Sequence, residues 1–100
     1  MSECCLTLLV PAALKESMLD ALLMAAPAKL ISSAPAAVHG VSHRAMSTGE
    51  QVLGMVGMTQ VQVLLALADC DKVVASLGQQ FAGSGVRYWL VSVLGEGELG

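Results

Sequence analysis

Charged and aromatic side chains are scarce in this 100-residue chain. Only 13% of the residues are charged and 3% are aromatic, whereas 55% are hydrophobic; in an average soluble domain about a quarter of the residues are charged. The five Lys and Arg residues and the net charge of −3 offer no basic stripe for phosphate backbones, so nucleic acid is not an expected partner. The polar surface is also too small to cover a monomer, and other subunits or a membrane must cover the excess.

Long apolar runs that would cross a membrane are also missing. The best candidate, residues 51–68, has no charge but contains Thr59 and three glutamines, and its second half alternates in polarity. Alternation is typical of a strand rather than of a membrane helix. The N-terminus carries Glu3 where a signal peptide has positive charge. We therefore expect a cytoplasmic protein whose apolar surface is covered by other subunits.

Cysteine is limited to three residues, an odd number without a Cys-x-x-Cys pair. The pattern resembles neither a disulfide framework nor a zinc knuckle. Cys4 and Cys5 point to opposite faces if they start a strand, so one metal cannot easily use both. Cys70 falls in the first turn of a predicted helix, where a small buried hydrophobe is the favoured role.

Six elements are predicted within one domain spanning residues 1–100, because a chain of this size supports a single core. Apolar spacing and turn residues predict strands over 4–10, 29–44, 58–67 and 85–94, and helices over 11–26 and 69–83. The first helix would start at Pro11, and the second would have Asp69 as N-cap and Gly83 as C-cap. This βαββαβ order predicts a ferredoxin-like α+β sandwich, an antiparallel sheet with two helices on one face. Three of the strands are apolar on both sides, so other subunits should bury the opposite face.

Four stretches in this order, "LTLLVPAALKESMLDALL", "HG", "GEQVLG" and "GSGVRYWLVSVL", resemble a small uncharacterised bacterial PII-like family. It is related to the nitrogen-regulatory PII and CutA proteins, and its genes often lie beside heavy-metal efflux pumps. The resemblance covers nearly the whole chain and implies a homotrimer with the sheets packed around a three-fold axis. It also implies that the loop over residues 43–58 contacts a partner, for which a membrane efflux transporter is a candidate. Clefts between subunits would bind a nucleotide or another small effector.

The effector and any cofactor remain unidentified by the sequence. The candidate effector contacts are His39, Arg44, Glu50, Gln51, Gly83, Ser84, Gly85 and Arg87. Nucleotide-binding PII proteins surround phosphates with Lys and Arg, whereas only Arg44 and Arg87 lie near these loops, which argues against ATP or ADP. The N–H groups of residues 83–85 can hold an anion, or the segment is an ordinary helix-to-strand turn. Glu50 and Gln51 either contact a partner or cap the next turn.

His39 and His43 are the candidate metal ligands. In a strand they would share a face but lie roughly 13 Å apart, too far to chelate one ion. A turn within "HGVSH" would bring them together, as would a three-fold axis for one histidine from each subunit; the alternative is a pair of histidines without a ligand. Met46, Met55 and Met58 are soft ligands suited to Cu(I), although packing is the favoured role.

No Ser, His and Asp residues stand at the spacing of a known catalytic motif, so we expect no enzyme activity. The sequence favours a non-catalytic PII-like regulator or sensor that binds a small effector or metal between subunits and signals to a partner. The alternative is a CutA-like metal-binding protein that confers tolerance to Cu or Zn.

Overall fold

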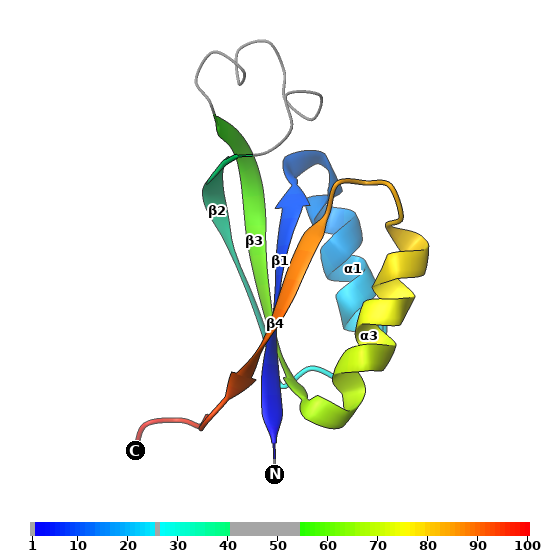
Figure 1. The fold of residues 1–100 in the computed structure, drawn as a ribbon. Helices are drawn as coiled ribbons and strands as arrows, with labels where there is room; N and C mark the ends of the chain where they lie inside the picture. The colour runs from blue at the N-terminus through cyan, green and yellow to red at the C-terminus, as the bar shows by residue number, and fades with distance from the viewer. Residues whose placement is uncertain (1, 26, 41–54) are drawn as a thin grey trace.

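A computed structural model describes residues 2–25, 27–40 and 55–100. Within these ranges the chain forms a four-stranded antiparallel sheet with two helices on one face (Figure 1). The elements are β1 (Glu3–Pro11), the 3-10 turn η1 (Ala12–Leu14), α1 (Lys15–Ala25), β2 (Leu30–His39), β3 (Met55–Ala66), α3 (Leu67–Gln80) and β4 (Arg87–Val93). This order confirms the predicted ferredoxin-like α+β fold.

Strand β1 lies at the centre of the sheet, in the order β2-β3-β1-β4. Its residue Leu6 is paired with Val63 on β3 and with Leu90 on β4. Alternate residues of β1 face the helices and are at most 2% exposed: Cys4, Leu6, Leu8 and Val10. They form the core together with Met18 and Leu22 of α1 and with Val73 and Leu77 of α3.

The first helix begins later than the sequence predicted. Pro11 has φ −51° and ψ 140°, which is an extended backbone conformation rather than a helical one. It is therefore the last residue of β1, and η1 leads into α1 at Lys15. The helical spacing itself was predicted correctly, because Met18 and Leu22 are buried on its inner face while Glu16 and Asp20 are exposed.

Strands β2 and β3 form the other half of the sheet. Strand β2 is an edge strand, and it includes Pro35, a residue that is tolerated at sheet edges. Strand β3 begins at Met55, so the last four residues of the predicted loop 43–58 belong to the sheet. Met55 is paired with His39 at the end of β2. The remainder of that loop, up to residue 54, falls outside the described residues.

Helix α3 starts two residues before the predicted N-cap. Leu67 is its first residue, and Ala66 is an N-cap without a side-chain hydrogen bond. Asp69 instead lies in the first turn, where its negative charge complements the helix dipole. At the other end the helix stops at Gln80 with Phe81 as C-cap, so Gly83, with φ +73°, belongs to the turn that follows. Among the described residues, no helix is both long and apolar enough to cross a bilayer.

Both helices lie on one face of the sheet, and within the described residues no element covers the opposite face (Figure 1). Trp89 and Val91 of β4 lie on this face and are 43% and 50% exposed. On the other side of the same strand, Tyr88 and Leu90 are also exposed, since the helices do not extend over this edge. Strand β4 is thus an apolar edge strand that is open on both faces.

An ion-pair cluster connects the C-terminal segment to the beginning of β1. The Lys29 ammonium lies 3.2 Å from the Glu3 carboxylate and 3.4 Å from that of Glu96. The ion pair with Glu3, supported by the one with Glu96, raises the pKa of Lys29 above its ordinary value of 10.5. The beginning of β1 and the end of β4 lie at the same end of the sheet, because these strands pair antiparallel with Glu3 opposite Val93 (Figure 1).

Candidate functional site

A groove of about 370 Å³ lies between the C-terminal half of α3 and the beginning of β4. Leu6 and Leu8 of β1 contribute to it, and α1 contributes Met18. The remaining lining residues come from α3, from the turn that follows it and from β4: Val74, Leu77, Gly78, Phe81, Ala82, Gly83, Gly85, Val86 and Tyr88. The volume falls within the range of small-molecule sites, and the walls are mostly apolar.

The turn over residues 81–86 shapes the outer end of this groove. The Ser84 N–H donates to the Phe81 carbonyl at 3.1 Å, and the Ser84 hydroxyl donates to the same oxygen. That hydroxyl also accepts a hydrogen bond from the Val86 N–H at 3.4 Å. Ser84 is therefore engaged in building the turn, while the N–H groups of its two glycine neighbours give no hydrogen bond to a backbone carbonyl of a described residue.

Gly83 and Gly85 are needed in this turn because of their backbone conformation. Their φ angles are +73° and +87°, in the left-handed region that residues with a Cβ adopt at a cost. An added Cβ would meet nothing within 4 Å at Gly83 and only the Pro11 side chain at 4.0 Å at Gly85. The dihedral angle, rather than crowding, therefore explains both glycines.

The structure brings some of the predicted effector contacts together and separates others. Gly83 and Gly85 line the groove, and Ser84 lies between them. Arg87 is paired with Leu9 and lies on the open face of the sheet, opposite to the face of Tyr88. His39 is exposed at the end of β2, at the far edge of the sheet from β4.

The other predicted contacts are not part of the described chain. Arg44, Glu50 and Gln51 fall within residues 41–54, and so does His43, the proposed metal partner of His39. Gly40, directly after His39, has φ +80°, which bends the chain at this point. Over residues 2–25, 27–40 and 55–100, no cluster of three or more His, Cys, Asp or Glu side chains suitable for a metal ion is present.

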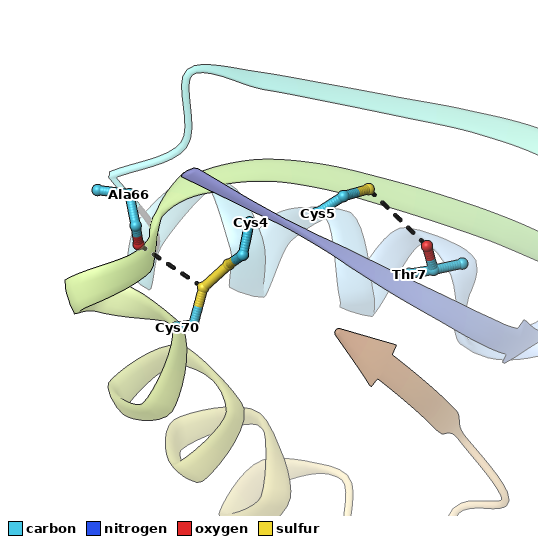
Figure 2. Close-up of a disulfide and its surroundings, with 5 residues drawn as sticks. All are labelled: Cys4, Cys5, Thr7, Ala66 and Cys70. Carbon is cyan, nitrogen blue, oxygen red and sulfur yellow. Dashed lines mark hydrogen bonds between the residues drawn. A yellow bond between two sulfur atoms is a disulfide. The ribbon is translucent and has the colours of Figure 1, made fainter. Parts of the chain in front are cut away.

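A disulfide joins Cys4, near the start of β1, to Cys70 in the first turns of α3 (Figure 2). This bond corrects the expectation that the cysteines do not form a disulfide framework and that Cys70 only packs as a hydrophobe. Both cysteines are buried, and burial of Cys70 was expected from its role as a small hydrophobe. Cys5 points to the opposite face of β1, as predicted from strand alternation, and remains a free thiol.

Sequence reasoning missed the pairing because it depends on which elements face each other. Cys4 shares the buried side of β1 with Leu6 and Leu8, and Cys70 shares the buried side of α3 with Val73 and Leu77. Both periodicities are visible in the sequence. The 66-residue separation becomes a contact only when α3 packs on β1.

The strand order and the two helices on one face of the sheet define the fold of this protein as ferredoxin-like. The chain belongs to a family of proteins of unknown function, DUF3240, whose profile matches residues 1–100. No functionally curated protein matches the chain.

Solved structures share the fold at low sequence identity. A DUF3240 family protein from Shewanella baltica OS155 has a TM-score of 0.80 at 15% identity, over 100% of this chain and 99% of the other. CPII, a nitrogen regulatory PII-like protein from Thiomonas intermedia K12 with bound ADP, AMP and bicarbonate, has a TM-score of 0.73 at 15% identity, over 98% of each chain. A Bacillus cereus protein related to NIF3 has a TM-score of 0.72 at 14% identity, over 97% of this chain and 26% of the other.

Proposed function

We propose that this protein is a non-catalytic PII-like regulator that works as a homotrimer and binds a small effector where the α3–β4 groove meets a second copy. One observation carries the proposal: an apolar groove of about 370 Å³ opens beside β4, an edge strand that is exposed on both faces. Such an edge is normally covered in a native assembly. A neighbouring subunit at this edge would complete the groove as a cleft.

The walls of the groove indicate the chemistry of the effector. Phe81, Tyr88 and Leu8 suit a flat or apolar body, and the N–H groups of Gly83 and Gly85 suit one acceptor or anionic group. None of the described residues that line the groove is basic. CPII, of similar fold, binds ADP, AMP and bicarbonate, but a groove without Lys or Arg favours an effector with little charge over a triphosphate.

The open sheet face supports the homotrimer. It combines apolar side chains of three strands, among them Leu64, Trp89 and Val91. Burying such faces against each other removes apolar area from water, which is the main favourable term in association. It would also reduce the apolar surface that a chain with 13% charged residues exposes to water.

The remaining parts of the proposal concern partner, metal and compartment. The segment over residues 43–58 would pass the effector state to a protein partner, with a membrane efflux transporter as the candidate, by a change in its order. A metal ion on His39 and His43 is the alternative effector. We place the protein in the cytoplasm, where disulfides are uncommon; the Cys4–Cys70 bond would then be present for only part of the time.

Calorimetric titration with AMP, ADP, ATP and bicarbonate tests the groove. Gly78 lines it, and a Cβ at this position meets nothing within 4 Å, so Gly78→Leu places a side chain in the groove without disturbing the core. Gln79→Leu adds a similar side chain one residue away, outside the groove. We expect Gly78→Leu to weaken binding of the active compound at least about tenfold and Gln79→Leu to leave it unchanged, because only the first occupies the site. Equal affinities for the two variants, or tighter binding of ATP than of AMP, would contradict the proposal.

A further inference from the structure

The Cys4–Cys70 disulfide holds the N-terminal end of α3 on the beginning of β1. Cys4 is 1% exposed and Cys70 is 2% exposed, and the bond crosses from the second residue of β1 to the fourth residue of α3. The groove lies at the opposite end of the same helix. The disulfide is therefore separate in space from the proposed effector contacts.

The surroundings of Cys70 suit a thiol as well as a disulfide. Its Sγ lies 3.6 Å from the carbonyl oxygen of Ala66, in the geometry of a sulfur hydrogen bond (Figure 2). Only a protonated thiol can donate to that oxygen, so the reduced side chain already has an acceptor in place. Reduction thus leaves the hydrogen of the buried Cys70 thiol with a partner.

The separation of the two backbones favours the reduced state. The Cα atoms are 7.2 Å apart, beyond the usual range of disulfides, so unbonded thiols fit at these positions and the bond requires a small backbone movement. A free cysteine thiol packs as a small hydrophobe, and the neighbours of Cys4 in the core are aliphatic. Neither state requires β1 or α3 to leave the fold.

The pair is isolated from the third cysteine. Cys5 lies on the opposite face of β1, where its sulfur is 3.9 Å from the Thr7 hydroxyl. The strand separates it from Cys4 and Cys70 (Figure 2). The Cys5 thiol therefore does not exchange with the Cys4–Cys70 disulfide, and the redox couple involves two sulfur atoms only.

A small reagent can approach the bond from the end of the molecule. A shallow depression of about 400 Å³ is lined by the residues next to the two cysteines: Ser2, Glu3, Ala66, Leu67 and Ala68. Leu67 is 52% exposed, and the first turn of a helix and the first residues of a chain open at low cost. Local opening there would uncover the sulfurs without global unfolding.

We propose that Cys4 and Cys70 form a regulatory thiol–disulfide exchange site that responds to low-molecular-weight thiols of the glutathione type. The thiolate of one such molecule attacks a sulfur of the bridge, breaks the S–S bond and forms a mixed disulfide. A second molecule attacks that mixed disulfide and leaves as part of an oxidised dimer. Two reagent thiols thereby give two electrons and two protons to the protein, and the oxidised dimer drives the reverse reaction. The oxidised form holds the start of α3 on β1, and the reduced form releases it.

The test is a redox titration of the folded full chain without any effector, so its result does not depend on the proposed groove. Wild type and Cys5→Ser are equilibrated in glutathione buffers from fully reduced to fully oxidised, quenched in acid, alkylated and weighed by mass spectrometry. We expect Cys5→Ser to pass from two free thiols to none in one transition, with its midpoint between the glutathione ratios of a reducing and an oxidising compartment. Wild type should follow the same transition, from three thiols to one.

Three outcomes would overturn the proposal. The bond could persist in the most reducing buffer, which would make it a permanent cross-link. The thiols could stay free in the most oxidising buffer, which would make the pair a packing contact. A stable glutathione adduct on either cysteine would show that the second exchange step does not occur.

Hydrogen exchange on the same samples measures the consequence for α3. Amides of residues 70–74 should exchange at least about tenfold faster in the reduced wild type than in the oxidised one, because the first turns lose their covalent anchor. Cys70→Ala serves as the control, since its exchange should not respond to the buffer. Equal protection in both states of the wild type would refute the release of the helix.

Discussion

Replacement of Trp89 by glutamate tests whether other copies cover the open face of the sheet. Trp89 lies on that face, opposite Thr7 of the central strand, and is 43% exposed in one chain. A tryptophan presents up to about 250 Å², so about 110 Å² remain to be buried at an interface. At about 25 cal/mol per Å² this burial is worth about 2.7 kcal/mol per copy.

Glutamate at this position both removes that area and places a charge where it would be desolvated. A buried carboxylate without a partner costs several kcal/mol, so the total loss per copy exceeds the burial term alone. A difference of 1.4 kcal/mol already changes an association constant tenfold. We therefore expect Trp89→Glu to be a folded monomer at micromolar concentration.

Light scattering coupled to size exclusion measures this change. Wild type should have about three times the chain mass of 10.3 kDa, and Trp89→Glu should have the mass of one chain with an unchanged far-ultraviolet circular dichroism spectrum. Leu23→Glu is the matched control, because Leu23 is 73% exposed on α1, away from the sheet. A monomeric wild type, or a folded Trp89→Glu protein with the wild-type mass, would refute the reasoning.

Three further predictions concern stability. Gly78→Ala should stabilise the protein by about 0.5–1 kcal/mol in urea unfolding, because α3 gains a better helix former and the Cβ meets no neighbour. Gly83→Ala should destabilise the protein by about 1–2 kcal/mol, because Gly83 has a φ of +73°. A gain in stability in Gly83→Ala would contradict the turn geometry. Reduction of the disulfide should lower the unfolding free energy by about 4 kcal/mol, since it frees a loop of 66 residues in the unfolded chain, and equal urea midpoints with and without dithiothreitol would contradict this. The contribution of the Lys29 ion pairs should be fully present below the ordinary pKa of 10.5 and be lost as pH rises through the higher folded value. Thermal melts of wild type and Lys29→Met should therefore converge only above that pH, and convergence at neutral pH would show that the pairs contribute nothing.

The sequence predicted the type and order of the four strands and two helices but not the 3-10 turn η1, because most of these elements have a clear period of their own. Val61, Val63 and Leu65 alternate with polar or less buried neighbours and indeed face the helices. Element ends were predicted less well. Pro11 and Asp69 both suit the start of a helix locally, but strand pairing extends β1 through Pro11, and β3 leads directly into α3 at Leu67.

The candidate site was predicted only in part. Gly83 and Gly85 stood out in the sequence because glycines between a helix and a strand indicate a turn, and they do line the groove. Leu6, Met18, Phe81 and Tyr88 gave no comparable signal, since an apolar residue that lines a groove looks like any core residue. Only the packing of β1, α1 and α3 shows that the core does not extend to β4.

The sequence by itself determined the fold class, since local periodicity depends on near neighbours along the chain. Tertiary structure decided the contacts between distant segments. It joined Cys4 to Cys70 across 66 residues, placed His39 and Gly83 at opposite sides of the sheet, and left a groove between α3 and β4. The physical reason is that such contacts depend on how the helices lie across the sheet, and this angle follows from the packing of the whole core rather than from any one segment.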